Sequence, residues 1–510
     1  MIRSFLTVGG WTMASRVVGF LRDILIAAFL GAGPVAEAFV IAFSLPNMFR
    51  RFFAEGAFNM AFIPLFAKKV EKGDGALDFA RDALSGLAAI LIAFTLLAQL
   101  AMPWLVYAMA SGFAGDARFD LAVVYGRIAF PYILFISLAA LLSGVLNSLG
   151  RFAAAAAAPV LLNVILVGAM LAARQAGWDM GLTLAWAVPV AGVAQVALVW
   201  WAAARAGFRL VPRMPRLTPE LKQLAIIAAP AALSGGVLQI NLLVGRQVAS
   251  FSDGALQYLN LADRLYQLPL GVVAIAIGVV LLPELSRRLG AEDEQGGRDA
   301  FNRAMEFALL LTLPAAVALV LIPGPLVTVL FERGAFLPED SAKTALALTI
   351  YGFGLPAFVL QKVLQPLYFA RSDTKSPFRY ALVAMVINAV LAIGLAFWIG
   401  FYAAALATTV AAWAMVWMLW RGSRAMGPAA QLDRALRQRV LRMLLACATM
   451  GLVLWGAMHW AAPVFEMARW RILALVGLLM LALISYFGSA TALGAVNSSD
   501  LRRALRKSRV

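Results

Sequence analysis

The sequence contains very little cysteine, histidine or charge for its length. Its 510 residues include one cysteine and one histidine, and only 14% of them are charged, whereas a soluble domain carries about 25% charged residues. A single Cys447 excludes a disulfide framework and a metal site built from several thiolates. His459, beside Trp460, is interpreted as a side chain at a membrane interface. No phosphate-binding loop, His-Glu metal motif or nucleophile motif is present, so the sequence argues against a soluble enzyme and a secreted scaffold.

Hydrophobic residues, by contrast, make up 63% of the chain. A chain of this composition cannot hide its apolar surface from water, so its solvent is expected to be lipid. The apolar stretches are long and continuous rather than short and alternating, which favours helices of about 20 residues over a β-barrel. We therefore predict an all-α integral membrane protein with fourteen transmembrane helices, at about 4–29, 36–66, 82–109, 121–146, 153–173, 181–203, 223–248, 256–283, 303–331, 344–369, 378–398, 402–420, 440–459 and 470–490.

Basic residues indicate the orientation of these helices. The net charge of +17 would suggest nucleic acid in a soluble chain, but in a membrane protein Lys and Arg gather in the cytoplasmic connections. With a cytoplasmic N-terminus, 29 basic residues fall in the cytoplasmic connections and six fall in the outer ones. Both termini are therefore predicted to lie in the cytoplasm, and no nucleic-acid partner is expected.

Two parts of the chain resemble each other at a nearly constant offset. Pro64 recurs as Pro283, 219 residues later, and Asn163 recurs as Asn388, 225 residues later. This pattern predicts two six-helix lobes with the same orientation in the membrane, an arrangement found in transporters. The predicted division is 1–210 for the first lobe, 211–425 for the second, and 426–510 for two additional helices and a basic cytoplasmic tail.

Several charged residues lie inside the predicted helices, where a charge at the bilayer centre costs ~3 kcal/mol or more. The set expected to line a wet cavity is Arg16, Arg22, Arg50, Arg264 and Lys362 with Asp23, Glu55 and Asp263. Arginine dominates this set, and guanidinium groups bind phosphate through two parallel hydrogen bonds. The predicted ligand is therefore an anion, a phosphate or diphosphate. The alternative is that these charges form interhelical ion pairs that fix the bundle.

The second predicted helix contains an unusual segment between Pro46 and Gly56. Proline inside a helix removes a backbone hydrogen bond, and irregular helices at membrane depth occur where they line a cavity or are buried in protein. Arg51 and Glu55 are four residues apart and can form an ion pair. We expect a helix break here, with Arg51 and Glu55 as supporting charges.

Three motifs in these regions resemble one family. Residues 15–23 (SRVVGFLRD), residues 45–58 (LPNMFRRFFAEGAF) and residues 262–265 (ADRL) closely resemble the MurJ/MviN family of lipid II flippases, within the superfamily of multidrug and polysaccharide exporters. The resemblance extends over the whole chain in its number of helices, its duplication and its two extra C-terminal helices.

The resemblance implies a bacterial inner-membrane protein that moves lipid II, the undecaprenyl-diphosphate-linked disaccharide-pentapeptide, outward for peptidoglycan synthesis, with the synthesis machinery as a further partner. It also implies that Arg16, Arg22, Arg50 and Arg264 bind the headgroup. Glu37 stands where the family usually has aspartate and is counted as a supporting charge.

Two further sites follow from the resemblance. The last two helices would form a groove for the lipid tail, here with Leu454, Trp455, Leu475 and Leu479. A sodium site known among relatives would involve Asn241 and Asn388, but no carboxylate accompanies them, which argues against sodium coupling.

The predicted function is a transporter that works by alternating access and not an enzyme. Only the headgroup is expected to cross the cavity, because extracting the tail from lipid costs ~0.8 kcal/mol per methylene. No cofactor or metal is expected, and the energy would come from the membrane potential, a monovalent cation gradient or downstream consumption of the substrate. The alternatives are a multidrug or other polyprenyl-linked oligosaccharide exporter and a membrane glycan transferase or polymerase.

Overall fold

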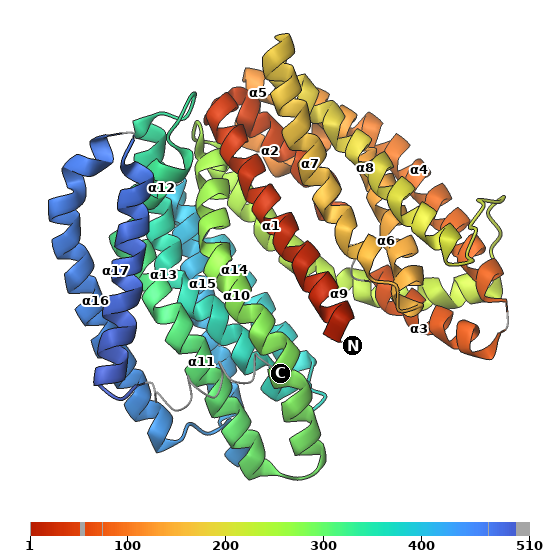
Figure 1. Cartoon of the computed structure of the whole chain (residues 1–510). Coiled ribbons are helices and arrows are strands. Elements are labelled where there is room, and N and C mark those ends of the chain that lie inside the picture. The colour runs from red at the N-terminus through yellow and green to blue at the C-terminus, as the bar shows by residue number, and fades with distance from the viewer. Residues whose placement is uncertain (1, 51–56, 74, 468, 496–510) are drawn as a thin grey trace. The chain divides into compact units, whose positions relative to one another are not determined.

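The computed structural model describes residues 2–50, 57–73, 75–467 and 469–495, and within them every element of regular secondary structure is a helix (Figure 1). The chain divides into two compact units. Unit 1 comprises Met1–Gln257 with Arg333–Phe336, and unit 2 comprises Tyr258–Glu332 with Leu337–Val510. The all-helical prediction is therefore confirmed for the described part of the chain.

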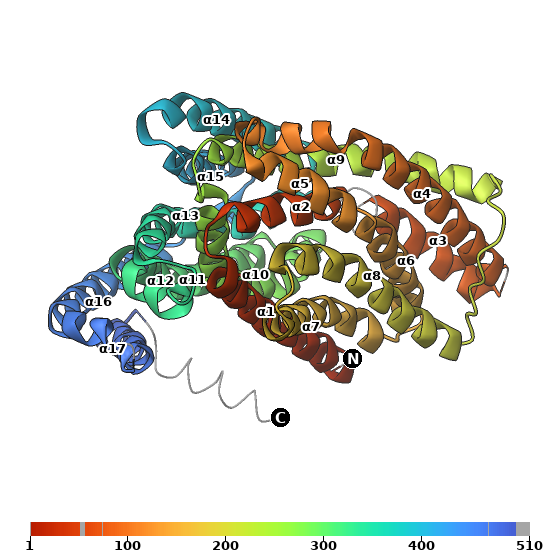
Figure 2. The same cartoon turned by 90° about the horizontal axis from the view of Figure 1, so that it is seen from above.

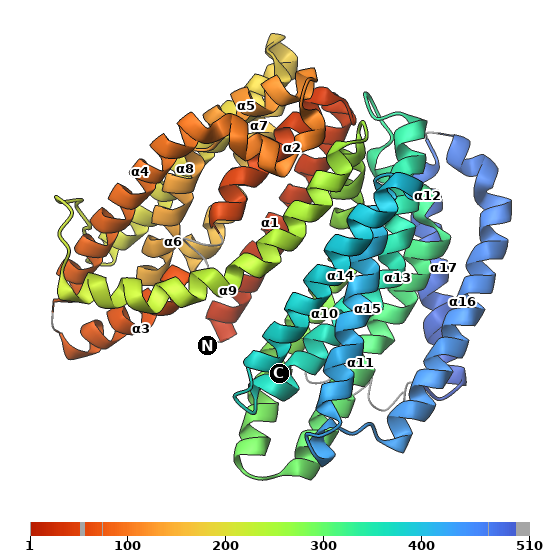
Figure 3. The same cartoon turned by 180° about the vertical axis from the view of Figure 1, so that it is seen from behind.

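Unit 1 is a bundle in which α1 packs against α7, α2 against α5, and α8 against both α6 and α7. Figure 3 shows α9 passing beside α3, so this helix belongs to unit 1 although it follows the predicted end of the first lobe at residue 210. The helices are α1 (Ile2–Leu30), α2 (Pro34–Arg50), α3 (Ala57–Lys72), α4 (Ala76–Met109), η2 (Ser111–Phe113), α5 (Ala117–Ala129), α6 (Tyr132–Ser148), α7 (Ala153–Ala176), α8 (Met180–Arg205) and α9 (Pro219–Ser250).

Unit 2 repeats this kind of packing, with α15 against both α13 and α14, and α11 against α13. Figure 2 shows α16 and α17 side by side, and α16 also packs on α11. The helices are α10 (Ala255–Gly290), whose first residues belong to unit 1, α11 (Glu294–Leu321), α12 (Pro323–Phe331), α13 (Pro338–Phe369), α14 (Lys375–Ile399), α15 (Tyr402–Ser423), η3 (Pro428–Ala430), α16 (Arg434–Glu466) and α17 (Arg471–Ala492).

Side-chain caps fix where several helices begin. Asp116 accepts a hydrogen bond from the Arg118 N–H at the start of α5, and Asp179 accepts one from Leu182 N–H, at 2.6 Å, at the start of α8. Asp293 and Asp433 cap α11 and α16 in the same way. A carboxylate at this position satisfies a free backbone N–H group and lies at the positive end of the helix dipole.

Ten helical segments of the described chain are long and apolar enough to cross a membrane: α4, α5 with α6, α7, α8, α11, α13, α14, α15, α16 and α17. Their outer surfaces carry large apolar side chains; on α14, for example, Phe397 and Trp398 are 89% and 86% exposed. Such a surface is stable only in lipid. The chain is therefore a helical protein with many membrane spans.

Two predicted helices are interrupted in the structure. The predicted helix 121–146 consists of α5 and α6, which meet at Phe130 and Pro131, and the predicted helix 303–331 consists of α11 and α12, separated at Ile322. Within the second predicted helix, α2 continues through Pro46 to Arg50. Gly56, the other residue expected to break that helix, lies outside the described residues, as do Arg51 and Glu55.

Candidate functional site

Arg22 is the most enclosed of the predicted headgroup arginines. It lies on α1 and is 7% exposed. Its Nε and Nη2 atoms donate to Oδ1 of Asp23 at 3.0 and 2.7 Å, and its Nη1 donates to Oδ1 of Asn163 on α7 at 2.9 Å. All three nitrogens of the guanidinium group are therefore engaged within the protein, as a buried charge requires.

Asn163 completes this arrangement. Its amide nitrogen donates to the backbone oxygen of Ser15 at 3.1 Å, while its oxygen accepts from Arg22. Gly19 allows the approach, because a Cβ atom there would lie 3.2 Å from the Asn163 nitrogen. The structure thus joins α1 to α7 through Arg22, which also pairs with Asp23, another of the predicted cavity charges. Asn163 is a residue that sequence reasoning used only as a sign of the duplication.

The other predicted arginines have more open surroundings. Arg16 is exposed on α1, and Arg50, the last residue of α2, is half-buried. Arg264 is half-buried on α10 in unit 2. The structure therefore describes three of these arginines in one unit and the fourth in the other.

The remaining predicted charges of unit 2 have different environments. Asp263 is half-buried on α10 and accepts a hydrogen bond from Gln267, one turn further along the same helix. Lys362 is exposed on α13. A lysine on the surface of such a helix can extend its ammonium group toward a polar region.

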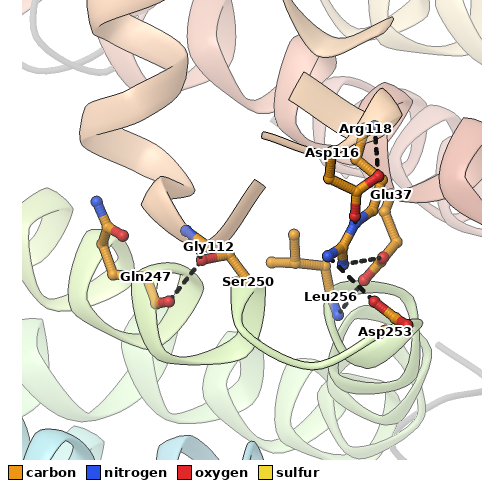
Figure 4. A network of polar contacts seen from close by, with 8 residues as sticks. All are labelled: Glu37, Gly112, Asp116, Arg118, Gln247, Ser250, Asp253 and Leu256. Carbon is orange, nitrogen blue, oxygen red and sulfur yellow. Dashed lines mark hydrogen bonds and ion pairs between the residues drawn. The ribbon is translucent and has the colours of Figure 1, made fainter. Parts of the chain in front are cut away.

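Glu37 is the most enclosed carboxylate of an ion network in unit 1 (Figure 4). The residue is 1% exposed. Its Oε2 accepts a hydrogen bond from Nη1 of Arg118 at 3.0 Å, and its Oε1 accepts one from the backbone N–H of Leu256 at 3.1 Å. The predicted supporting charge therefore joins α2 to the start of α5 and the start of α10.

Arg118 is the hub of this network, and sequence reasoning assigned it only to an outer connection. It is 6% exposed, and its guanidinium group contacts Asp116 at 2.5 Å and Asp253 at 3.1 Å in addition to Glu37. Hydrogen bonds from the Arg118 backbone N–H and then from its guanidinium lower the pKa of Asp116 below its ordinary value. One arginine thus neutralises part of the charge of three carboxylates.

A second set of contacts lies beside this network (Figure 4). Gln247 Oε1 accepts from the backbone N–H of Ser111 at 2.9 Å, and Ser250 Oγ accepts from the backbone N–H of Gly112 at 3.0 Å. A Cβ atom at Gly112 would lie 2.5 Å from the Ser250 backbone. Only glycine permits this approach, which holds η2 against the end of α9.

The segment between α8 and α9, which crosses the predicted lobe boundary at residue 210, is tied to α4. Arg213 donates to Asp82 at 2.6 Å and to Asp78 at 3.1 Å, and its backbone N–H donates to Ser85 Oγ at 2.9 Å. The hydrogen bond with Asp82 is the main cause of a raised pKa at Arg213. The spacing of Asp78, Asp82 and Ser85 places them on one helix face, a signal that the sequence analysis did not use.

The residues expected to line a tail groove divide into two groups. Leu454 and Leu475 are buried, at 0% and 6% exposure, whereas Trp455 and Leu479 are exposed, at 70% and 36%. Leu454 packs in the core that α16 and α17 share with partly buried residues of α11. Of these four side chains, Trp455 and Leu479 are therefore the two that present surface to lipid.

The residues considered for sodium lie in separate units. Asn388 is buried on α14, and its Oδ1 accepts a hydrogen bond from Thr408 at 3.4 Å, while Asn241 is half-buried on α9. In the described parts of the chain, no group of three or more His, Cys, Asp or Glu side chains is placed to hold a metal ion.

Buried charges inside a bundle of membrane-length helices are typical of membrane transporters. The solved structures agree at the level of the fold. The chain superposes on "Lipid II flippase MurJ, inward closed conformation" with a TM-score of 0.79 and 23% identity, covering 95% of this chain and 98% of that one. An inward-facing multidrug resistance MATE family transporter gives a TM-score of 0.68 at 16% identity, covering 81% of this chain and 95% of that one.

Sequence comparisons identify the family. The family model "Lipid II flippase MurJ" matches residues 26–473. The "Probable lipid II flippase MurJ" of Rhizobium meliloti is 44% identical over 99% of this chain and 96% of its own length. The "Lipid II flippase MurJ" of Burkholderia cenocepacia is 34% identical over 99% of both chains. The chain belongs to the lipid II flippase MurJ family, which confirms the resemblance and the assignment to transporters instead of enzymes.

Proposed function

We propose that this protein moves lipid II from the cytoplasmic to the outer leaflet of the bacterial inner membrane. The observation that carries the proposal is the 44% identity over nearly the full length with a relative named as a probable lipid II flippase. The MATE transporters share only the fold, at 16% identity, so they give the multidrug alternative no comparable support. In this role the protein supplies lipid-linked precursor for peptidoglycan synthesis, cell-wall biogenesis and cell shape.

The proposed site consists of Arg16, Arg22, Arg50 and Arg264, which would contact the diphosphate of the headgroup. The exposure of Arg16 and the partial exposure of Arg50 and Arg264 support this role. Arg22 would have to exchange its bond to Asn163 for one to the diphosphate. Such an exchange keeps Arg22 fully hydrogen-bonded and takes a donor only from the neutral Asn163 oxygen. Its free-energy cost is therefore small compared with leaving a buried charge unpaired.

The proposed arrangement has fourteen transmembrane helices in two parallel six-helix lobes, residues 1–210 and 211–425, with two further helices in 426–510. The four predicted helices beyond the ten described above coincide with α1, α2 with α3, α9 and α10. The excess of basic residues on one side supports cytoplasmic termini. Alternating access would then expose the headgroup site first to the cytoplasm and then to the outside.

The test is depletion of the protein in its own host, followed by measurement of lipid II in each leaflet with an impermeant probe. We expect lipid II to accumulate in the cytoplasmic leaflet and to return to the outer leaflet when the wild-type gene is restored. Unchanged distribution in depleted cells would contradict the proposal. Release of a new glycan product from lipid II by the purified protein would instead favour a transferase or polymerase.

A further inference from the structure

Unit 1 contains a cavity of about 770 Å³ that none of the predicted headgroup residues line. It lies where α1 and α7 begin and where α6 and α8 end, which is one end of the bundle. Its walls are mainly apolar and include Trp11, Leu161, Leu198 and Trp201. Tryptophan is enriched where a membrane protein passes from lipid to water, so this cavity has the composition of a site at the membrane interface.

Two arginines, Arg151 and Arg205, complete the lining. The backbone conformation at two helix ends fixes the positions of both residues. Gly150 has a φ of 72°, and the Arg151 N–H donates to the Leu146 carbonyl at 2.9 Å. This arrangement is a Schellman motif at the end of α6. At the end of α8, Gly207 has a φ of 93° and allows the same motif, two residues after Arg205. Arg151 and Arg205 are thus held at two adjacent helix ends.

Both arginines are exposed, and their guanidinium groups contact neutral neighbours. Arg205 stacks on Trp201, with its Cζ 4.2 Å from the ring centroid, and Arg151 donates to the Arg205 carbonyl at 3.4 Å. Neither forms an ion pair with a carboxylate among the residues that the structure describes. By contrast Arg371, in the corresponding connection of the predicted second lobe, contacts Glu294 at 3.5 Å.

The floor of the cavity also favours an anion. Ala153, Ala154 and Ala157, which have small side chains, line it at the start of α7. The residue before this helix, Phe152, provides no side-chain cap. Free N–H groups at the positive end of a helix attract phosphate, so they add to the attraction of the two guanidinium groups.

We propose that this cavity binds an anionic glycerophospholipid, with the phosphodiester on Arg151 and Arg205 and the acyl chains against Trp11, Leu161 and Leu198. The apolar walls adjoin the arginines directly, so the fitting ligand carries its charge and its hydrocarbon in one molecule. Free phosphate would leave these walls uncovered. This site is separate from the proposed headgroup site, and its assignment does not depend on lipid II being the cargo.

The test measures lipid binding to the full-length protein in detergent by native mass spectrometry, with dioleoyl phosphatidylglycerol and with dioleoyl phosphatidylcholine as the neutral comparison. A hydrogen bond to a charged group contributes at least about 1.5 kcal/mol, or tenfold in affinity. We expect about tenfold weaker phosphatidylglycerol binding in Arg151→Ala or Arg205→Ala and about 100-fold weaker binding in the double variant. Arg216→Ala, an exposed linker residue outside the cavity, should bind as wild type.

Each other outcome would overturn the proposal. Unchanged binding in the double variant would place the lipid elsewhere, and equal binding of phosphatidylcholine would show that the anionic charge is not recognised. If the double variant binds phosphatidylglycerol normally but loses lipid II, the cavity is a substrate site. An unchanged melting temperature confirms that the variants fold, and failure of lipid II transport in the wild type would leave this binding result unaffected.

Discussion

Replacing Arg118 with alanine should destabilise unit 1 more than replacing its partner Glu37. Arg118→Ala leaves the Glu37 carboxylate buried with backbone N–H groups, those of Gly254 and Leu256, as its partners. Breaking a buried ion pair in this way costs about 3–5 kcal/mol. Glu37→Gln keeps an oxygen for the Leu256 N–H and leaves Arg118 paired with Asp116 and Asp253. Its cost should be about 1–2 kcal/mol.

The double variant Glu37→Gln with Arg118→Ala removes the buried carboxylate together with its counter-charge. It should therefore be more stable than Arg118→Ala alone, because an amide is less costly to bury than an unpaired charge. This gain in stability from the second substitution is expected because the Glu37 side chain is 1% exposed, whereas that of Asp253 is 92% exposed. Figure 4 shows both carboxylates beside Arg118. If the stability losses of the two single variants were simply additive, the double variant would be less stable than Arg118→Ala.

Thermal denaturation of the purified chain in detergent measures these differences. At about 2–4 °C per kcal/mol, Arg118→Ala should lower the melting temperature by roughly 6–20 °C and Glu37→Gln by roughly 2–8 °C. Arg127→Ala, an exposed arginine on the same helix, is the control and should change it little. Equal losses in the two single variants, or a double variant less stable than Arg118→Ala, would refute the reasoning.

Three further predictions concern orientation, the arginines and pH. In intact spheroplasts of a Cys447→Ala strain, a cysteine that replaces Ala425 should resist an impermeant thiol reagent, and one that replaces Ala114 should react. Labelling at position 425 and protection at position 114 would overturn the predicted orientation. Arg16→Ala should express normally but fail to complement a depleted strain. Arg22→Ala should fail as well and should also be less abundant in the membrane, because it breaks the buried ion pair with Asp23 at a cost of about 3–5 kcal/mol. Equal membrane abundance of the two variants would contradict the structure. The pKa of Asp116 is lowered below 3.8 in the folded state, first by the Arg118 backbone N–H and then by its guanidinium. The stabilising effect of Asp116 is therefore present above that pH and is lost as the pH falls through the folded pKa. Arg118→Ala removes the contribution of the guanidinium, so its melting temperature should decline less than that of the wild type between about pH 5 and pH 3.

The helical architecture could be predicted because it depends on local properties of the sequence. Runs of apolar residues define the helices, and the distribution of lysine and arginine gives the expected orientation. Interruptions within helices were harder to predict. Pro131 lies where α5 gives way to α6, yet α2 continues through Pro46, because the effect of a proline depends on the packing that surrounds it.

The polar networks could not be predicted, because they join residues that are distant in the sequence. Arg22 and Asn163 are 141 positions apart, and Glu37 and Arg118 are 81 positions apart. The sequence showed that Arg22 and Glu37 are charges in apolar surroundings and therefore need partners. It could not show whether those partners are protein groups or a ligand.

This distinction separates two uses of buried charge in the molecule. Arg118 contacts Glu37, Asp116 and Asp253, which lie on three different segments. Its charge therefore serves to hold those segments together. Arg22 contacts one carboxylate and one neutral amide, so one of its bonds can be given up to an anion without exposing a second charge. We therefore propose Arg22, and not Arg118, as a residue that both stabilises the bundle and takes part in binding a diphosphate.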